Sequence, residues 1–248
     1  MTLQKGILAF LFVGISYIIK GLAGFGDPLI SNPLLSMQFA TSTITPGLGI
    51  VSPVLNAELV IKNRKHFNAK LVLPIAGFNV LGIIPGVLLL ERFGANEWIK
   101  LVLGAVIIYL GIRMLLNGRE RPEKPNLPVC FAVSFASGVT AGLFGINMLY
   151  LPYMERIAEN REQFRANTCF VFIIADLIRL GMYVAKGLVT KDVLILAAIA
   201  LPAALVGMWA GSVIDRRVND SAAKRLIRYV FILGGISTVI YACIAIWG

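Results

Sequence analysis

The residues best placed for chemistry in this chain are a few ionisable side chains inside long apolar stretches. Asp27 interrupts the apolar N-terminal region within GFGDPLISNP, residues 24–33, which also contains two glycines and two prolines. Arg179 follows Asp176 by three residues in the apolar segment CFVFIIADLIRLGMYVA, residues 169–185. A buried carboxyl group could carry a proton or bind a cation, whereas a guanidinium group offers a fork of donors suited to oxyanions. These residue types therefore favour ion binding.

Each of these side chains also has a structural interpretation, and the sequence leaves both open. Asp27 stands directly before Pro28, a common helix start, so its carboxylate could cap a helix. Arg179 could form an i, i+3 ion pair with Asp176 among packed helices. Lys20 could neutralise Asp27, or it could extend its amine toward a polar surface.

Uncharged polar residues and glycines complete the candidate binding site. Amides and hydroxyls can hydrogen-bond an anion without carrying a formal charge, although they join membrane helices equally often. Glycines let the backbone turn and approach a ligand closely. The predicted binding residues are Gly24, Gly26, Asp27, Pro28, Asn32, Asn56, Gly145, Asn147, Asn167, Thr168 and Arg179, with Asp27 as the candidate for proton coupling.

The rest of the composition argues against other kinds of site. His66 is the only histidine, and Cys130, Cys169 and Cys243 all fall in apolar runs, where they read as small buried hydrophobes. The net charge of +10 comes from short clusters of Lys and Arg without the interleaved aromatic residues of a nucleic-acid surface. We therefore expect no metal, no cofactor, no nucleic-acid partner and no enzymatic activity.

The elements that must position the candidate residues are membrane helices. Hydrophobic residues make up 58% of the 248 residues and charged residues only 15%, against about one half and one quarter in soluble domains. Apolar runs at 71–90, 98–116, 193–214 and 229–247 are each close to the roughly 20 residues that cross a bilayer. Because lipid satisfies no backbone hydrogen bonds, the sequence predicts an all-α polytopic membrane protein with the bilayer as its environment.

The two halves of the chain also resemble each other. Residues 24–33 align with LFGINMLYLP, residues 143–152, and Gly82 and Gly86 align with Gly207 and Gly211. The glycine pairs are expected to pack helices closely. This order of matches predicts a first repeat over 1–116, a cytoplasmic linker over 117–126 and a second repeat over 127–248.

The distribution of positive charge predicts that the two repeats are inverted. If each glycine-proline motif is the tip of a hairpin (about 6–40 and 127–160) followed by three spans, there are about ten membrane helices. Of the 21 Lys and Arg residues left when Lys20 and Arg179 are set aside, 16 then fall on one side, in clusters at 62–70, 113–124, 156–165 and 216–228. By the positive-inside rule that side is cytoplasmic, and both termini lie outside.

Inverted repeats with broken helices are typical of secondary transporters, whose substrate binds near the midplane where the repeats meet. Each break should leave the free N–H groups of a following half-helix pointing into the site. We accordingly expect Gly26 and Gly145, one at each tip, to approach each other there.

The sequence resembles the TauE/SafE family of sulfite-exporter-like membrane transporters. The resemblance rests on GLAGFGDPLISNPLL, residues 21–35, on GVTAGLFGINMLYLP, residues 138–152, and on the repeated Gly-x3-Gly helices, and it covers nearly the whole chain. It implies a multi-pass protein of the bacterial inner membrane that transports a small anion such as sulfite, a sulfonate (sulfoacetate, for example) or a related organosulfur anion. The alternatives are an anion channel or a carrier for a non-sulfur carboxylate, and a homodimer is one open assembly state. The family often has a glycine cluster where this chain has Asp27 and Pro28.

Overall fold

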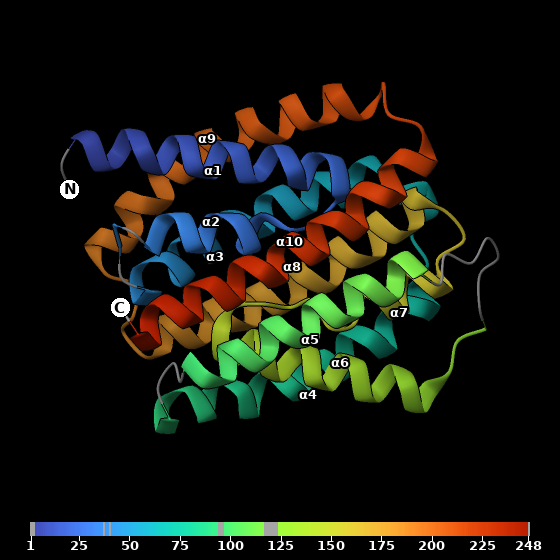
Figure 1. Ribbon diagram of the computed structural model, residues 1–248, viewed down its shortest axis with the longest axis horizontal. Helices are drawn as coiled ribbons and strands as arrows, with labels where there is room; N and C mark the ends of the chain where they lie inside the picture. The colour runs from blue at the N-terminus through green and yellow to red at the C-terminus, as the bar shows by residue number, and fades with distance from the viewer. Residues whose placement is uncertain (1–2, 37, 40, 94–96, 117–123, 248) are drawn as a thin grey trace.

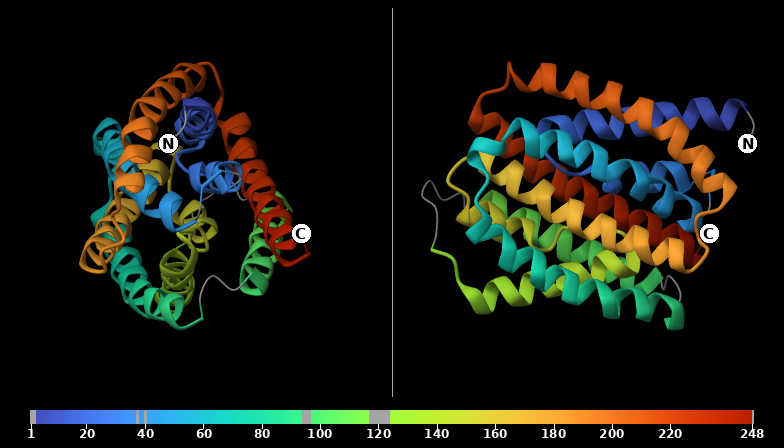
Figure 2. Two further views of the ribbon diagram at one scale, coloured as in Figure 1. Left: turned by 90° about the vertical axis from the view of Figure 1, so that its left-hand side faces the viewer. Right: turned by 180° about the vertical axis from the view of Figure 1, so that it is seen from behind.

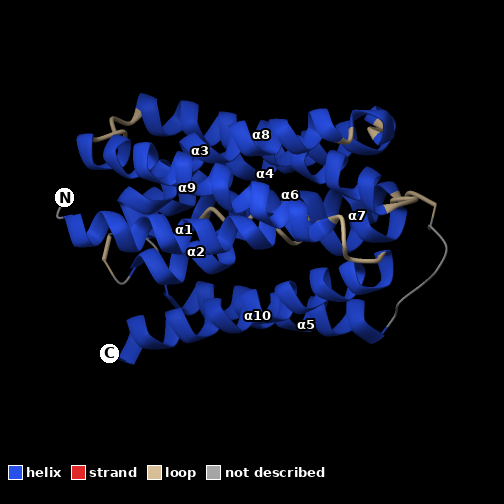
Figure 3. Ribbon diagram, turned by 90° about the horizontal axis from the view of Figure 1, so that it is seen from above, coloured by secondary structure: helices blue, strands red, loops and turns tan. Residues whose placement is uncertain are grey.

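The computed structural model describes residues 3–36, 38–39, 41–93, 97–116 and 124–247. These residues form ten α-helices and one short 3-10 helix, without a strand among them (Figures 1 and 3). The helices are α1 (Leu3–Ala23), α2 (Asp27–Ser36), α3 (Thr41–Lys62), α4 (Ala69–Phe93), α5 (Glu97–Leu116), α6 (Leu127–Phe144), α7 (Leu151–Ile157), α8 (Arg161–Ala185), α9 (Lys191–Asp215) and α10 (Asp220–Trp247), with the 3-10 helix Arg64–His66 between α3 and α4.

Five of these helices, α1, α3, α4, α8 and α9, are long and apolar enough to cross a bilayer. Shorter apolar segments lie in α6 and α10, at Leu127–Leu143 and Ile232–Trp247. Large apolar side chains such as Leu81, Trp209 and Leu233 are exposed on the surface of the bundle, where lipid would cover them. The predicted class, an all-α polytopic membrane protein, is confirmed at this level, and ten membrane helices stay a prediction.

Long-range helix pairs build the bundle. Helix α1 packs along α9, α4 along α6 and α5 along α10, while α3 and α8 contact each other between them (Figures 1 and 2). A Cβ atom on Gly82 would lie 2.1 Å from the carbonyl oxygen of Phe135, and one on Gly207 would lie 2.3 Å from that of Gly14. The predicted close packing through these glycines is therefore confirmed.

The connections between helices separate to two ends of the molecule. The start of α1, the end of α10 and the α8–α9 connection lie at one end (Figure 1). The α3–α4, α7–α8 and α9–α10 connections lie at the other, as the reverse view also shows (Figure 2). The basic clusters around 62–70, 156–165 and 216–228 are thus gathered at one end. Residues 117–123 of the predicted linker lie outside the described residues.

Both glycine motifs break a helix, as the sequence predicts. Gly24 and Gly26, with φ of 88° and 104°, separate α1 from α2, and Gly145, with φ of 73°, ends α6. Glycine is required there because this backbone region strains other residues. The arm after Gly145 differs from the prediction of a half-helix: residues 146–148 have no regular structure, a turn follows, and α7 begins only at Leu151.

The segment after Gly145 has a different structural role from the one expected. Since α7 begins six residues after Gly145, its free N–H groups are not at the tip. The Asn147 side chain exchanges hydrogen bonds with Asn79 and accepts one from Ser137, and these bonds hold the irregular segment in place of helical ones. An irregular backbone buried by protein is tolerated at membrane depth for this reason.

Candidate functional site

Helix α8 carries most of its polar residues on its buried face. Its exposed positions include the apolar residues Leu177 and Val184. The buried ones include Arg161, Arg165, Asn167, Thr168, Asp176 and Arg179. Charged groups in a membrane helix are costly unless protein surrounds them, and such groups often mark substrate or ion pathways. The candidate site is therefore centred on α8.

Two of the predicted residues meet across the first helix break. The Lys20 Nζ atom lies 2.9 Å from Asp27 Oδ1, and the two side chains are 1% and 4% exposed. Lys20 Nζ also lies 5.1 Å from the centre of the Tyr17 ring, which favours its positive charge. Of the two roles open to Lys20, the structure shows the neutralisation of Asp27. Asp27 is also the first residue of α2, so a helix does start at this position, and a cap by its carboxylate stays a prediction.

The second charged pair lies on α8 itself. Arg179 Nη2 is 3.6 Å from Asp176 Oδ1, the i, i+3 ion pair that the sequence allows. The charges of Lys20 and Asp27 both act on Asp176, and that of Asp27 also acts on Arg179, so the two pairs are neighbours. We call Lys20, Asp27, Asp176 and Arg179 the central charge cluster. It holds two cations and two anions, all buried.

Glycines leave the guanidinium group of Arg179 unobstructed. A Cβ atom on Gly145 would lie 3.7 Å from both Arg179 terminal nitrogens, and one on Gly49 would lie 3.9 Å from Nη2. The Nε atom of Arg179 is buried and has no hydrogen-bond partner in the described part of the chain. A buried donor without a partner is costly, and an anion would supply the missing acceptor.

Polar residues of α3 border the cluster. Asn56 Nδ2 donates to Ser52 Oγ at 3.0 Å, and Ser52 in turn hydrogen-bonds the Asp176 carboxylate. The Asn56 Oδ1 atom is buried and accepts no hydrogen bond from the described residues. The structure thus brings Asn56 to the cluster and adds Ser52, which sequence reasoning missed. The predicted Asn32 and Pro28 lie half-buried in α2.

Asn147 is engaged elsewhere. Its side chain exchanges hydrogen bonds with Asn79, at 2.8 and 3.1 Å, and its Oδ1 atom accepts from Ser137 Oγ at 2.7 Å. These bonds join α4, α6 and the irregular segment, which is the interhelical role that the sequence left open for it. A role for Asn147 as a ligand stays a prediction.

Asn167 and Thr168 lie further along α8, away from Arg179. Asn167 Oδ1 accepts from the backbone N–H of Asn68 at 3.0 Å. Tyr150 donates to the backbone carbonyl of Thr168 at 3.2 Å. The Asn167 Nδ2 and Thr168 Oγ1 atoms are buried, and no described residue hydrogen-bonds them. Both keep capacity for a ligand on this part of α8.

The two helix breaks contact different arginines of α8. A Cβ atom on Gly24 would meet the Arg165 side chain at 2.8 Å, whereas one on Gly145 would lie 3.7 Å from the terminal nitrogens of Arg179. The expected approach of Gly26 to Gly145 stays a prediction.

The described residues contain no cluster of His, Cys, Asp or Glu able to hold a metal ion. What they do contain is a charge-balanced cluster between α1, α2 and α8, bordered by α3 and by the break after α6. Buried charges that are paired but incompletely hydrogen-bonded fit an ion-binding site in a polytopic membrane protein.

Comparison with known proteins agrees with this class. The family model described as "Sulfite exporter TauE/SafE" matches residues 7–238, so the chain belongs to this family of membrane transporters. A curated relative, the "Probable sulfite/organosulfonate exporter TauE" of Cupriavidus necator, is 24% identical over 222 residues, which cover 82% of this chain and 85% of the relative. No solved structure gives a significant match. The family resemblance found in the sequence is confirmed.

Proposed function

We propose that this protein is a secondary transporter that moves a small organosulfur anion, such as sulfite or a sulfonate, across the bacterial inner membrane. The observation that carries the proposal is the buried Arg179 guanidinium, which faces Gly145 and keeps an unpartnered donor. A planar fork of donors suits the oxygens of sulfite or a sulfonate. The name of the curated relative supports this class of substrate.

Charge balance in the central charge cluster suggests how a proton would be coupled. With both carboxylates ionised, two cations face two anions and no charge remains for a substrate. A proton on Asp27 would release Lys20 from its ion pair and give the cluster one net positive charge. A monovalent anion would restore neutrality, so that anion and proton bind together.

An inverted-repeat architecture is part of the proposal, and the helix contacts support it. In this arrangement α1 to α5 of the first half correspond, in order, to α6 to α10 of the second half. When each helix is exchanged for its counterpart, the contact pair α1–α9 becomes α6–α4, and the pair α3–α9 becomes α8–α4. The pairs α3–α8 and α5–α10 convert into themselves. This pattern is expected of two copies related by a twofold axis in the membrane plane.

Cysteine labelling in intact cells tests the topology. In a cysteine-free background, a cysteine in place of His66 or Glu159 should be shielded from an impermeant thiol reagent, because the basic end faces the cytoplasm. A cysteine in place of Leu188 should react. All three positions are exposed, so burial would not protect them. Labelling of positions 66 and 159 from opposite sides would contradict the inverted arrangement.

A thermal-shift screen of the purified protein tests the substrate class. Sulfite, sulfoacetate, taurine, sulfate and simple carboxylates should be compared at equal ionic strength. A specific ligand raises the melting temperature by mass action, by about 2.7 kcal/mol of stability at a hundred times its Kd. Stabilisation by sulfite or sulfoacetate alone supports the proposal. Stabilisation by carboxylates alone would replace it with a carboxylate carrier.

A channel would need a continuous polar path, whereas a carrier shows a saturable flux. Apart from α8, the described helices that are long enough to cross the membrane bury few charged residues. We therefore favour a carrier, and a flux through proteoliposomes that does not saturate with substrate would favour the channel.

A further inference from the structure

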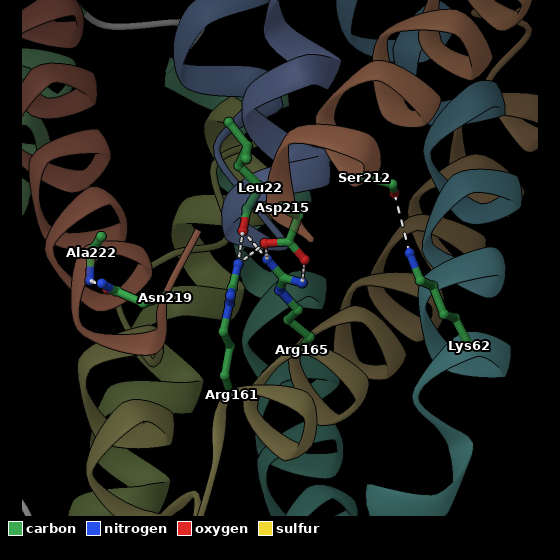
Figure 4. Close-up of polar contacts among 8 residues, drawn as sticks. All are labelled: Leu22, Lys62, Arg161, Arg165, Ser212, Asp215, Asn219 and Ala222. Atoms are coloured by element: carbon green, nitrogen blue, oxygen red, sulfur yellow. Dashed lines mark hydrogen bonds and ion pairs between the residues drawn. The ribbon is translucent and has the colours of Figure 1, made fainter. Parts of the chain in front are cut away.

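The buried arginines of α8 have different surroundings. Arg161 and Arg165, in its first turns, form ion pairs with Asp215 of α9 and donate to the Leu22 carbonyl of α1, so they join three helices at the basic end (Figure 4). Arg179 lies further along α8, where it belongs to the central charge cluster. The α3 side of that cluster decides what else a ligand of Arg179 would meet.

One face of α3 is turned toward the charged residues of α8. Gly49, Ser52 and Asn56 follow one another at i, i+3 and i+7, which places them on the same face of the helix. A Cβ atom on Gly49 would lie 3.9 Å from Arg179 Nη2, and Ser52 hydrogen-bonds Asp176. Asn56 continues this face toward the end of α3.

The hydrogen bonds along this face can run in only one direction while Asp176 is ionised. Ser52 has a single hydroxyl proton, and a carboxylate can only accept, so Ser52 donates to Asp176. The Ser52 oxygen then accepts from Asn56, whose Nδ2 atom lies 3.0 Å away. The orientation of the Asn56 amide follows from this order, and its Oδ1 atom is left as an acceptor.

The Asn56 oxygen is an acceptor that lacks a donor. Asn56 is fully buried, and no described residue donates to its Oδ1 atom. The Nε atom of Arg179 has the opposite shortage, since it is a buried donor for which the described residues supply no acceptor. Because unpaired buried polar groups are costly, a ligand that pairs with both atoms is favoured over one that pairs with a single atom.

The two unpaired atoms lie within reach of one small ligand. Contacts in series lead from Asn56 through Ser52 and Asp176 to Arg179, the first at 3.0 Å and the last at 3.6 Å. They place the amide and the guanidinium group within about 10 Å of each other. Hydrogen bonds of about 2.9 Å at both ends of a ligand leave about 4 Å between its outer polar atoms. A sulfonate oxygen and a hydroxyl oxygen on a two-carbon chain are separated by about that distance.

We propose that Asn56 makes the site selective, among sulfonates, for those that carry their own hydrogen-bond donor. Arg179 binds the sulfonate oxygens, and Asn56 accepts from an O–H or N–H group at the other end of the ligand. A sulfonate without such a donor leaves Asn56 Oδ1 unpaired and binds more weakly. The inference rests on the proposed function, since it takes Arg179 as the ligand of the oxyanion.

The test compares the Kd values of hydroxyethanesulfonate and ethanesulfonate, measured by calorimetric titration of the full-length protein in detergent at constant ionic strength. The two anions have the same charge and differ in one hydroxyl group. The wild type should bind hydroxyethanesulfonate at least about tenfold more tightly, because a site built around a hydroxyl group rejects the analogue that lacks it. Asn56→Leu should reduce this ratio to less than about twofold by weakening the binding of the hydroxyl compound alone.

Asn63→Leu is the matched control. Asn63 directly follows α3, and its Nδ2 atom already donates to the Leu59 carbonyl at 2.8 Å. Its neighbour Lys62 donates to Ser212 Oγ of α9 at 3.3 Å, so this end of α3 is held by contacts outside the central charge cluster (Figure 4). The control should keep the wild-type ratio. If Asn56→Leu does not fold, Asn56→Ala makes the same test, since it removes the amide without adding bulk.

Methoxyethanesulfonate tests the direction of the hydrogen bonds, because its ether oxygen is an acceptor and not a donor. The wild type should bind it no better than ethanesulfonate. Ser52→Ala frees the Asn56 amide to turn its Nδ2 atom toward the ligand, so this variant should bind methoxyethanesulfonate at least about threefold more tightly than the wild type does. Wild-type affinity for methoxyethanesulfonate equal to that for hydroxyethanesulfonate would show that Asn56 is not held as an acceptor and would overturn the inference.

The remaining outcomes separate the inference from the proposed function. Equal affinities of the wild type for hydroxyethanesulfonate and ethanesulfonate, or a preference that survives in Asn56→Leu, would overturn the selectivity and leave Arg179-dependent binding of sulfonates intact. Arg179→Gln should weaken the binding of both compounds. If it binds both as tightly as the wild type, the proposed site at Arg179 fails, and the inference that rests on it fails as well.

Discussion

Replacing Asp27 with Asn should uncouple anion binding from protons. At 2.9 Å, the attraction between Lys20 and Asp27 is about 6 kcal/mol at an effective dielectric constant of about 20. While that attraction lasts, it competes with any anion for Lys20. Protonation of Asp27 removes it, and Asp27→Asn removes it permanently, since an amide has the shape of the acid without its charge.

The magnitude follows from proton linkage. If one proton binds with each anion, the affinity of the wild type falls as pH rises above the value at which the free site takes up that proton. The fall is about tenfold, or 1.4 kcal/mol, for each pH unit. Asp27→Asn should bind the anion with a Kd that changes less than about threefold over the same interval. It should also lose proton-driven transport.

The assay is calorimetric titration with methanesulfonate, which stays ionised throughout, so the pH dependence belongs to the protein. Repeating the titration in buffers of different ionisation enthalpy counts the protons taken up per anion. Asp192→Asn is the matched control, because this exposed carboxylate at the start of α9 is remote from Lys20 in the sequence and lies at a helix end. A wild-type pH profile together with wild-type flux in Asp27→Asn would refute the coupling and leave Asp27 as a helix start with an ion pair.

Two glycine substitutions test the packing and the site. Gly82→Ala should destabilise the protein by at least about 2 kcal/mol in thermal unfolding, because its Cβ atom would meet backbone of α6 that cannot move aside. The control is Gly77→Ala in the same helix, whose Cβ atom would meet nothing within 4 Å and which should leave the stability unchanged. Gly145→Ala and Gly187→Ala impose similar strain, at φ of 73° and 66°, of about 1–2 kcal/mol. Only Gly145→Ala should weaken sulfite binding, since Gly187 has open space around it; equal affinities in the two variants would remove Gly145 from the site.

Local features of this fold follow from the sequence. The helix breaks at Gly26 and Gly145 could be predicted because glycine and proline act on the backbone where they stand. The Asp176–Arg179 pair could be predicted because three residues separate its members on one helix. The packing of Gly82 and Gly207 was predicted from the repeated Gly-x3-Gly spacing.

Contacts between distant segments could not be predicted. Asn79 and Asn147 are 68 residues apart, and Arg165 and Leu22 are 143 apart, so their bonds depend on the packing of the whole bundle. The sequence left two roles open for Lys20, because the choice between them depends on how deeply the first hairpin enters the bundle. One signal was available for the ion pairs of Arg161 and Arg165 with Asp215: the two arginines begin a helix whose polar residues fall on one face. A membrane helix buries that face.

The uptake of radiolabelled sulfite into proteoliposomes tests the proposed transport most directly. The wild-type protein should give saturable uptake that is faster when the lumen is alkaline relative to the outside. Arg179→Gln should reduce the rate at least tenfold, whereas the exposed-charge control Arg217→Gln should leave it unchanged. Absence of saturable uptake by the wild type, or equal rates for Arg179→Gln and the wild type, would contradict an anion site at the central charge cluster.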